Sequence, residues 1–252
     1  MRNRLLNLLA SNRGRGEFRA EASEGGNTIW LYDQIVATED EASWWGGVAA
    51  DTFARTLLGM SGPVAIRINS PGGDVFGARA MAQAIREYPD QVTAHVDGYA
   101  ASAATFITSA ADRTIMAPGS MMMIHKASTI GWGNADDFAA TAVLLNKIDA
   151  SIAGTYAQVA EKRGVEPCDF AALMAAETWM DEDEAMAFGL ADEIAQGADK
   201  SAATSACERW DLSAYGRKPA RAVQTPAPEP AMPDPDLAAR RAKAAALLET
   251  PA

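Results

Sequence analysis

The chain has 252 residues, a formal net charge of −11 and a sequence pI near 4.7. An acidic balance argues against nonspecific nucleic-acid binding, which needs a basic surface to displace counterions, and it disfavours an anionic membrane as partner. Nearly half of the residues are hydrophobic, as in a globular protein with a sizeable core. Cys168 and Cys207 lie far apart and form no C-x-x-C pair, so we expect neither a zinc site nor a disulfide framework, and two free thiols suit a reducing cytosol.

The first 26 residues form a basic leader. The segment from Met1 to Arg15 contains four leucines, but polar residues such as Asn7 and Asn12 interrupt them, so the stretch lacks the apolar core of a signal peptide. We predict that this part is flexible or weakly helical, and that the polar residues 17–26 are a linker. Since no later run is long and apolar enough to span a bilayer, we expect a cytoplasmic protein.

Residues 27–195 show strands that alternate with helices. β-Branched and aromatic runs predict strands at residues 27–36, 64–69, 91–96, 113–117 and 121–125. Apolar residues at helical spacing predict helices at residues 47–58, 76–88, 101–111 and 135–163. Shorter helices or strands follow up to Ile194. This alternation is typical of the α/β class, with a mostly parallel sheet flanked by helices.

Residues 196–252 differ in composition from the preceding domain, and we predict that they form a low-complexity, disordered tail. The stretch 218–235 is rich in proline and poor in large apolar residues, so we predict disorder there. Residues 237–248 are rich in alanine and basic in the middle, which is compatible with a transient helix. The tail is either a segment that meets a partner or a linker remnant.

Ser102 stands among alanines in the stretch from Asp97 to Thr108, between a predicted strand and a predicted helix. A serine in the first turn of a helix lies near free backbone N–H groups, which favour an oxyanion formed beside it. Serine becomes a good nucleophile only where a base takes its proton. The alternative is an ordinary serine that stabilises the helix start. The surroundings do not form a G-x-S-x-G elbow, which argues against an α/β-hydrolase.

Two further stretches supply complementary chemistry. Gly72 and Gly73 follow a predicted strand, and such a pair can point N–H groups at a developing negative charge, cradle a phosphate or simply form a turn. His125 ends a strand of methionines, where its imidazole is either a general base or a structural group. We assign a structural role to His95, which lies mid-strand. Sequence spacing leaves three candidate carboxylates to orient the imidazole, namely Glu177, Asp181 and Asp183.

Three motifs occur in a characteristic order: N-S-P-G-G at residues 69–73, G-Y-A-A-S-A-A at 98–104 and M-M-I-H at 122–125. Together they resemble ClpP, the proteolytic subunit of the Clp protease, and most closely the ClpP-like head maturation proteases of tailed phages and prophages. The stretches N-T-I-W-L-Y-D near residue 30 and E-T-W-M-D-E-D-E-A-M-A-F-G-L-A-D from Glu177 are also similar to that subgroup. The resemblance covers roughly residues 27–194.

The resemblance implies the ClpP/crotonase spiral of ββα units, with a protruding handle helix after about residue 135. It implies that Ser102 is the nucleophile and His125 the general base, with the N–H groups of Gly73 and Ala103 forming the oxyanion hole. ClpP has an aspartate two residues before an aromatic residue, where this chain has Glu177 before Trp179. The resemblance therefore assigns the third position of the triad to Glu177, with a glutamate in place of the usual aspartate.

The expected function is that of a serine endopeptidase that needs no metal or nucleotide in this chain and processes capsid or scaffold proteins during phage head maturation. The expected partners are protein or peptide substrates and further copies of the chain in a ring, rather than nucleic acid or a membrane. If phage-encoded, it would act in the host cytoplasm. Two alternatives remain open: an inactive ClpP-like assembly protein and a crotonase-type enzyme acting on a coenzyme A thioester.

Overall fold

The computed structural model describes residues 4–23, 26–196 and 209–216, all within a compact unit that spans residues 1–218. The strands of this unit are β1 (Glu17–Ser23), β2 (Gly26–Tyr32), β3 (Ile35–Val36), β4 (Val48–Ala49), β5 (Val64–Ser70), β6 (Val92–Ala101), β7 (Arg113–Met116), β8 (Met121–Ile124), β9 (Thr178–Met180) and β10 (Glu193–Ile194). The helices are α1 (Arg4–Asn12), α2 (Glu39–Trp45), α3 (Ala50–Leu58), α4 (Val75–Glu87), the 3₁₀ turn η1 (Ser102–Ala104), α5 (Thr105–Ala110), α6 (Ala135–Lys162), α7 (Phe170–Ala175) and α8 (Glu182–Ala187).

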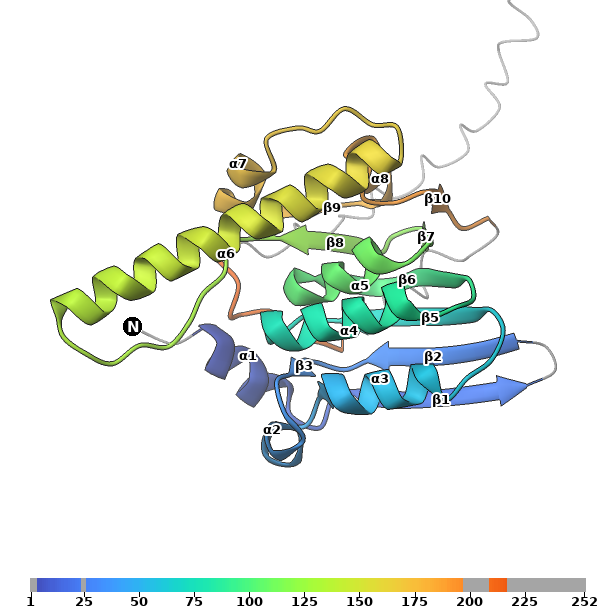
Figure 1. Cartoon of the computed structure of the whole chain (residues 1–252), viewed down its shortest axis with the longest axis horizontal. Helices are drawn as coiled ribbons and strands as arrows, with labels where there is room; N and C mark the ends of the chain where they lie inside the picture. The colour runs from blue at the N-terminus through green and yellow to red at the C-terminus, as the bar shows by residue number, and fades with distance from the viewer. Residues whose placement is uncertain (1–3, 24–25, 197–208, 217–252) are drawn as a thin grey trace, which may run out of the picture. The chain divides into compact units, whose positions relative to one another are not determined.

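The main sheet has the order β1-β2-β5-β6-β7-β10, and its strands are parallel except for β1. Parallel neighbours need crossover connections, and the helices between the strands supply them. One face of the sheet is covered by α3, α4 and α5 (Figure 1). Their apolar residues, including Phe53, Met81 and Ile107, are fully buried against strand residues such as Ile29, Ile66 and Val96. The observed α/β architecture confirms the fold class predicted from the sequence.

Strand β6 changes partners along its length, and this change positions the functional residues. Its first half pairs with β7, whereas Tyr99–Ala101 pair with Met121–Met123 of β8. Strand β8 also pairs with β9, in antiparallel orientation. The ends of three strands that are distant in sequence therefore meet at one place. A crevice where neighbouring strands diverge is a common position for a ligand site in α/β sheets.

Helix α6 has a buried half and an exposed half. Ile152, Tyr156 and Ala160 are buried in the core, whereas Phe138 and Leu144 near the start of the helix are exposed. Figure 1 shows the first half of α6 projecting beyond the sheet. This geometry agrees with the protruding helix that the sequence resemblance implied.

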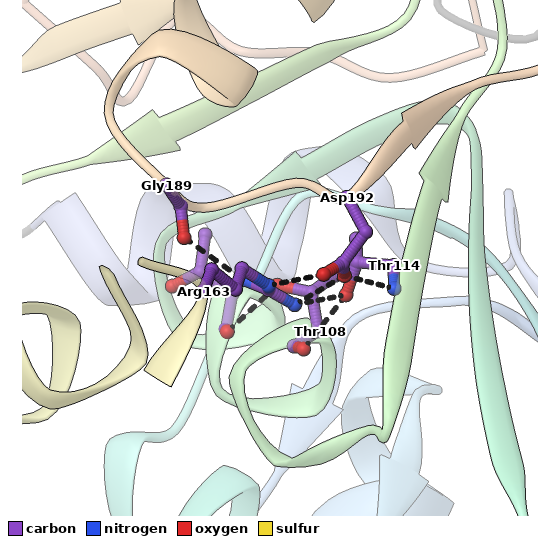
Figure 2. A network of polar contacts seen from close by, with 6 residues as sticks. Thr108, Thr114, Arg163, Gly189 and Asp192 are labelled. Atoms are coloured by element: carbon purple, nitrogen blue, oxygen red, sulfur yellow. Dashed lines mark hydrogen bonds and ion pairs between the residues drawn. The ribbon is translucent and has the colours of Figure 1, made fainter. Parts of the chain in front are cut away.

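The end of α6 is tied to the sheet by a polar network (Figure 2). Arg163, just after the helix, donates to Asp192 at 2.9 Å, to the Thr114 hydroxyl at 3.0 Å and to the Gly189 carbonyl at 3.1 Å. The Thr114 hydroxyl donates in turn to the carbonyl of Thr108. The network joins α6 to β7 and to the segment before β10, so it fixes the buried half of α6 against the core.

Several elements differ from the sequence-based expectation. Strand β6 continues to Ala101, five residues beyond the strand predicted at residues 91–96. Within the predicted flexible leader, residues 4–12 form helix α1 and residues 17–23 form strand β1, which pairs with β2. Within the predicted tail, residues 209–216 are part of the described structure, while the stretches 218–235 and 237–248 lie outside it. Among the described residues, no helix is long and apolar enough to cross a membrane.

Candidate active site

Ser102 lies in the turn between β6 and α5. It is the first residue of η1 and has a φ of 52°, in the left-handed region that non-glycine residues rarely adopt. The Thr105 hydroxyl donates to the Ser102 carbonyl at 2.6 Å, and the Tyr156 hydroxyl lies 2.6 Å from the same Thr105 oxygen. Because the Thr105 proton goes to a carbonyl, Tyr156 is the donor to Thr105. This buried chain of hydroxyls holds a strained backbone in place, as is common at functional sites.

His125 directly follows β8, and the structure brings it beside Ser102. The Ser102 Oγ lies 2.7 Å from the His125 Nε2, a hydrogen-bond distance. Local pairing explains the contact, because Ala101 and Met123 are opposite one another in the β6–β8 ladder and both reactive residues follow shortly after them. Burial lowers the pKa of His125 to about 4, with Glu177 raising it and Arg4 lowering it further. The imidazole is therefore neutral at pH 7, as a general base must be.

Glu177 is the carboxylate that the structure places next to His125. Strand β9 pairs antiparallel with β8, with Thr178 opposite Ile124, so the residue before β9 faces the residue after β8. Glu177 is buried and has a φ of 52°. It also accepts a hydrogen bond from Arg4 Nη1 at 3.0 Å. Of the other candidates, Asp181 caps α8 by accepting from the backbone of Glu184. Asp183 lies in the first turn of that helix.

Gly72 and Gly73 form a turn beside Ser102. The Ile35 N–H donates to the Gly72 carbonyl, and the Asp74 N–H donates to the Ile35 carbonyl. In such a parallel bridge the groups of the intervening residue face the other way, so the Gly73 N–H points away from Ile35. Gly73 lines the same cavity as Ser102 and Ala103. The Gly73 N–H is thus directed away from Ile35, at a turn that lines the cavity containing Ser102.

A mostly apolar cavity of about 170 Å³ opens beside Ser102. Its polar rim includes His125, and side chains from α5 and α6 line its interior, among them Phe106, Leu145, Ile148, Ile152 and Tyr156. The stretch of α6 from Thr141 to Tyr156 therefore forms one wall of the site. The cavity offers space for an apolar side chain next to a nucleophile. The described residues contain no cluster of three or more His, Cys, Asp or Glu side chains able to hold a metal ion.

Two residues near the site were missed at the sequence level. Arg4 of α1 pairs with Glu177, and the ring of Tyr215 lies edge-on to His125 with 5.4 Å between ring centroids. Both come from segments that composition assigned to a flexible leader and a disordered tail. The signals were present but weak: leucines at helical spacing in α1, and the apolar residues Trp210, Leu212 and Tyr215 within eight residues of the predicted tail.

The parallel sheet and the Ser102–His125 pair together define a serine-hydrolase type of site on an α/β scaffold. Residues 49–198, more than half of the chain, match the family model of the Clp protease. The chain belongs to the Clp protease family. The match includes Gly73, Ser102, His125 and Glu177, and it leaves out α1 and residues 209–216.

Individual relatives support this assignment. The chain is 33% identical over 139 residues to ATP-dependent Clp protease proteolytic subunit 1 of Protochlamydia amoebophila, covering 52% of this chain and 65% of that protein. It is 35% identical over 154 residues to proteolytic subunit 1 of Chlamydia abortus, covering 58% and 79%. It is 28% identical over 133 residues to the proteolytic subunit of Bacteroides fragilis, covering 52% and 63%. The chain thus spans slightly less than two thirds of the first of these relatives.

Proposed function

We propose that the protein is a serine endopeptidase of the ClpP type. The observation that carries this proposal is the 2.7 Å contact between Ser102 Oγ and His125 Nε2, made at the mouth of a cavity that Gly73 and Ala103 also line. A nucleophile, a neutral base and backbone donors at one point are the components of acyl transfer. Membership of the Clp protease family is consistent with the same chemistry.

In the proposed mechanism, His125 takes the Ser102 proton as the oxygen attacks the scissile carbonyl. The N–H groups of Gly73 and Ala103 stabilise the resulting oxyanion, and loss of one such donor typically costs about 3 kcal/mol of transition-state stabilisation. His125 then protonates the leaving amine. In the second half of the reaction, His125 takes a proton from the water that attacks the acyl-enzyme and returns it to the Ser102 oxygen as the acyl bond breaks. Glu177 stabilises the imidazolium that forms transiently. These steps use no nucleotide and no metal ion.

The cavity beside Ser102 suggests which peptides would be cleaved. Its interior is formed by aromatic and aliphatic side chains such as Phe106 and Ile152. We propose that it accepts a large apolar side chain on the acyl side of the scissile bond. A matched pair of peptides with leucine or aspartate at that position tests this point. The proposal requires much faster cleavage of the leucine peptide.

We further propose that the biological substrates are capsid or scaffold proteins of a tailed phage, cleaved in the host cytoplasm during head maturation. The support is the likeness of the sequence motifs to that subgroup. Incubating the protein with capsid and scaffold proteins encoded beside it tests this proposal. Site-specific cleavage that disappears in Ser102→Ala would support it, and intact capsid and scaffold proteins under conditions where model peptides are cut would refute it.

We also propose that the protein forms a ring-shaped homo-oligomer through the projecting half of α6. Phe138, Val143 and Leu144 are each more than half exposed there, which is unfavourable for apolar side chains in an isolated chain. Sedimentation velocity of the wild type and of Val143→Asp, at a position that does not line the cavity beside Ser102, tests the assembly. A stable monomer of the wild type with full activity would contradict it.

The enzymatic activity is tested with an alkyl fluorophosphonate, which reacts with activated serines. We expect stoichiometric labelling of Ser102, located by peptide mapping, and none in Ser102→Ala. His125→Ala should also abolish labelling, because the serine then lacks its base. Cleavage of a fluorogenic peptide should follow the same pattern. A folded protein that neither reacts with the probe nor cuts peptides would favour the inactive assembly role.

A further inference from the structure

Two of the segments outside the matched family region meet each other next to the reactive residues. Helix α1 and residues 209–216, which we call the cover, come from opposite ends of the described chain. Asn12 joins them through its side chain, which donates to the Asp211 carbonyl at 3.0 Å and accepts from the Asp211 N–H at 2.7 Å. One buried side-chain amide therefore joins α1 to residues 209–216 by two hydrogen bonds, and we call this pair of bonds the latch.

The cover packs on the strand ends that carry the nucleophile and the base. Leu8 of α1 and Trp210, Leu212 and Tyr215 form a buried apolar cluster with three strand residues, Tyr99, Ala101 and Met123. Ala101 directly precedes Ser102, and Met123 lies two residues before His125. The Trp210 indole also donates to the Asn69 side chain at 3.0 Å, at the start of the N-S-P-G-G turn. The cover is thus anchored at each strand from which the site is built.

The cover also contacts the site itself. Arg4 pairs with Glu177 at 3.0 Å, so it engages the carboxylate that faces the imidazole. Tyr215 places its ring against His125, and its hydroxyl donates to the Pro71 carbonyl beside the glycine turn. Tyr215 and the α1 residues Arg4, Leu5 and Leu8 line the cavity that also holds Ser102. One side of the cavity is therefore closed by parts of the chain that the matched family region does not include.

We propose that α1 and residues 209–216 form an intramolecular cover that restrains the catalytic site and must be displaced before a protein substrate can be cleaved efficiently. This inference rests on the proposed peptidase function and adds its regulation. Two features indicate that the cover restrains the catalytic residues rather than supporting them. Arg4 forms an ion pair with the Glu177 carboxylate, and Tyr215 occupies space next to the serine and the histidine. When only a fraction of molecules is open, the measured reactivity falls in proportion to that fraction.

The test uses full-length chains in which the cover is loosened at positions that contact neither Ser102, His125 nor Glu177. Asn12→Ala removes the latch, and Trp210→Ala removes the largest apolar anchor. After the second change, the Asn69 oxygen still accepts from the Tyr99 N–H. Ser213→Ala is the matched control, because Ser213 lies in the same segment with an exposed side chain. Circular dichroism and a cooperative melt establish that each variant is folded.

Two readouts are measured at pH 7: the rate of fluorophosphonate labelling of Ser102, and the rate of His125 modification by diethyl pyrocarbonate, read by peptide mass spectrometry. We expect both rates to rise about fivefold or more in Asn12→Ala and Trp210→Ala and to be unchanged in Ser213→Ala. Unchanged rates in the loosened variants would overturn the proposal. So would faster histidine modification with slower labelling, because the cover would then support the site rather than restrain it.

Failure of the proposed function would give a different pattern. If no variant shows labelling that depends on Ser102, the peptidase assignment is wrong. The modification rate of His125 then tests the cover by itself, because this rate reports how accessible the imidazole is and requires no enzymatic activity. A rise would support a cover over an inactive site, and no change would overturn it.

Discussion

Gly72 lies so close to Ser102 that a Cβ added to the glycine would stand 2.9 Å from the serine Cβ and 2.5 Å from the Ala101 carbonyl oxygen. Gly73 is equally confined, since its Cβ would approach the Ile35 carbonyl oxygen to 1.9 Å. Both glycines also have positive φ angles, of 90° and 146°. The turn and the nucleophile are therefore packed together without room for a side chain between them.

This packing predicts that Gly73→Ala abolishes fluorophosphonate labelling and lowers the free energy of unfolding by more than about 2 kcal/mol. Gly62→Ala is the matched control, because Gly62 also has a positive φ, of 81°, but a Cβ there would meet nothing within 4 Å. The control should lose about 1 kcal/mol from backbone strain alone and keep full labelling. Equal effects of the two substitutions in denaturant unfolding would contradict the packing.

The chain of hydroxyls behind Ser102 predicts a second effect. Thr105→Val removes the donor to the Ser102 carbonyl and the acceptor for Tyr156, with little change in volume. We expect a loss of about 1–3 kcal/mol in the free energy of unfolding, the usual cost of unpaired buried polar groups. The labelling rate should fall too, because the strained turn at Ser102 loses a restraint. Tyr156→Phe should cost less, since Thr105 keeps its bond to Ser102. Denaturant titration and labelling kinetics check both variants.

The buried imidazole predicts the pH dependence. The pKa of His125 is lowered to about 4 in the folded chain, against 6.5 in the unfolded chain. The unfolded chain therefore binds more protons as the pH falls from about 6.5 to about 4, so the contribution of His125 to stability is present above this window and is lost within it. Labelling of Ser102 should likewise persist below pH 6. A labelling profile with its acid limb at pH 6.5 or above would disagree with the structure.

Arg4 and Glu177 act on His125 in opposite directions. Arg4→Ala removes a cation that lowers the pKa of His125, so the acid limb of labelling should move to higher pH. Glu177→Gln removes the carboxylate that raises this pKa, and it also removes stabilisation of the imidazolium. We expect it to lower kcat/KM by about 10²-fold or more, as in other triads that lose their orienting carboxylate. Retention of activity by Glu177→Gln with loss in Asp181→Asn would move the third position to Asp181.

The polar network around Arg163 should contribute to stability but not to the reactivity of Ser102. Arg163→Ala leaves Asp192 and the Thr114 hydroxyl with fewer partners at a site where the arginine is only 11% exposed. We expect a loss of about 1–3 kcal/mol in unfolding free energy with little change in the labelling rate at temperatures where the variant is folded. Arg55→Ala breaks an exposed pair with Asp51 and should cost under about 1 kcal/mol. A similar cost for both would show that the network contributes no more than a surface ion pair.

The sequence could predict the alternation of strands and helices because the apolar periodicity is strong there. Ser102, Gly73 and His125 could be proposed as site residues because each stands at a strand end, where local chemistry and the family motifs coincide. The change of partners along β6 could not be read from the sequence, since Asp97 and Gly98, at the point where β7 gives way to β8, favour a turn rather than a strand that continues. The positions of Arg4 and Tyr215 depend on contacts between opposite ends of the chain, and composition carries no information about such contacts.

The most direct test of the central assignment is fluorophosphonate labelling of the full-length protein with mapping of the modified residue. The account predicts a single labelled site at Ser102 and complete loss of labelling in both Ser102→Ala and His125→Ala, with both variants folded. Labelling that persists in folded Ser102→Ala, or that is unaffected by His125→Ala, would contradict it.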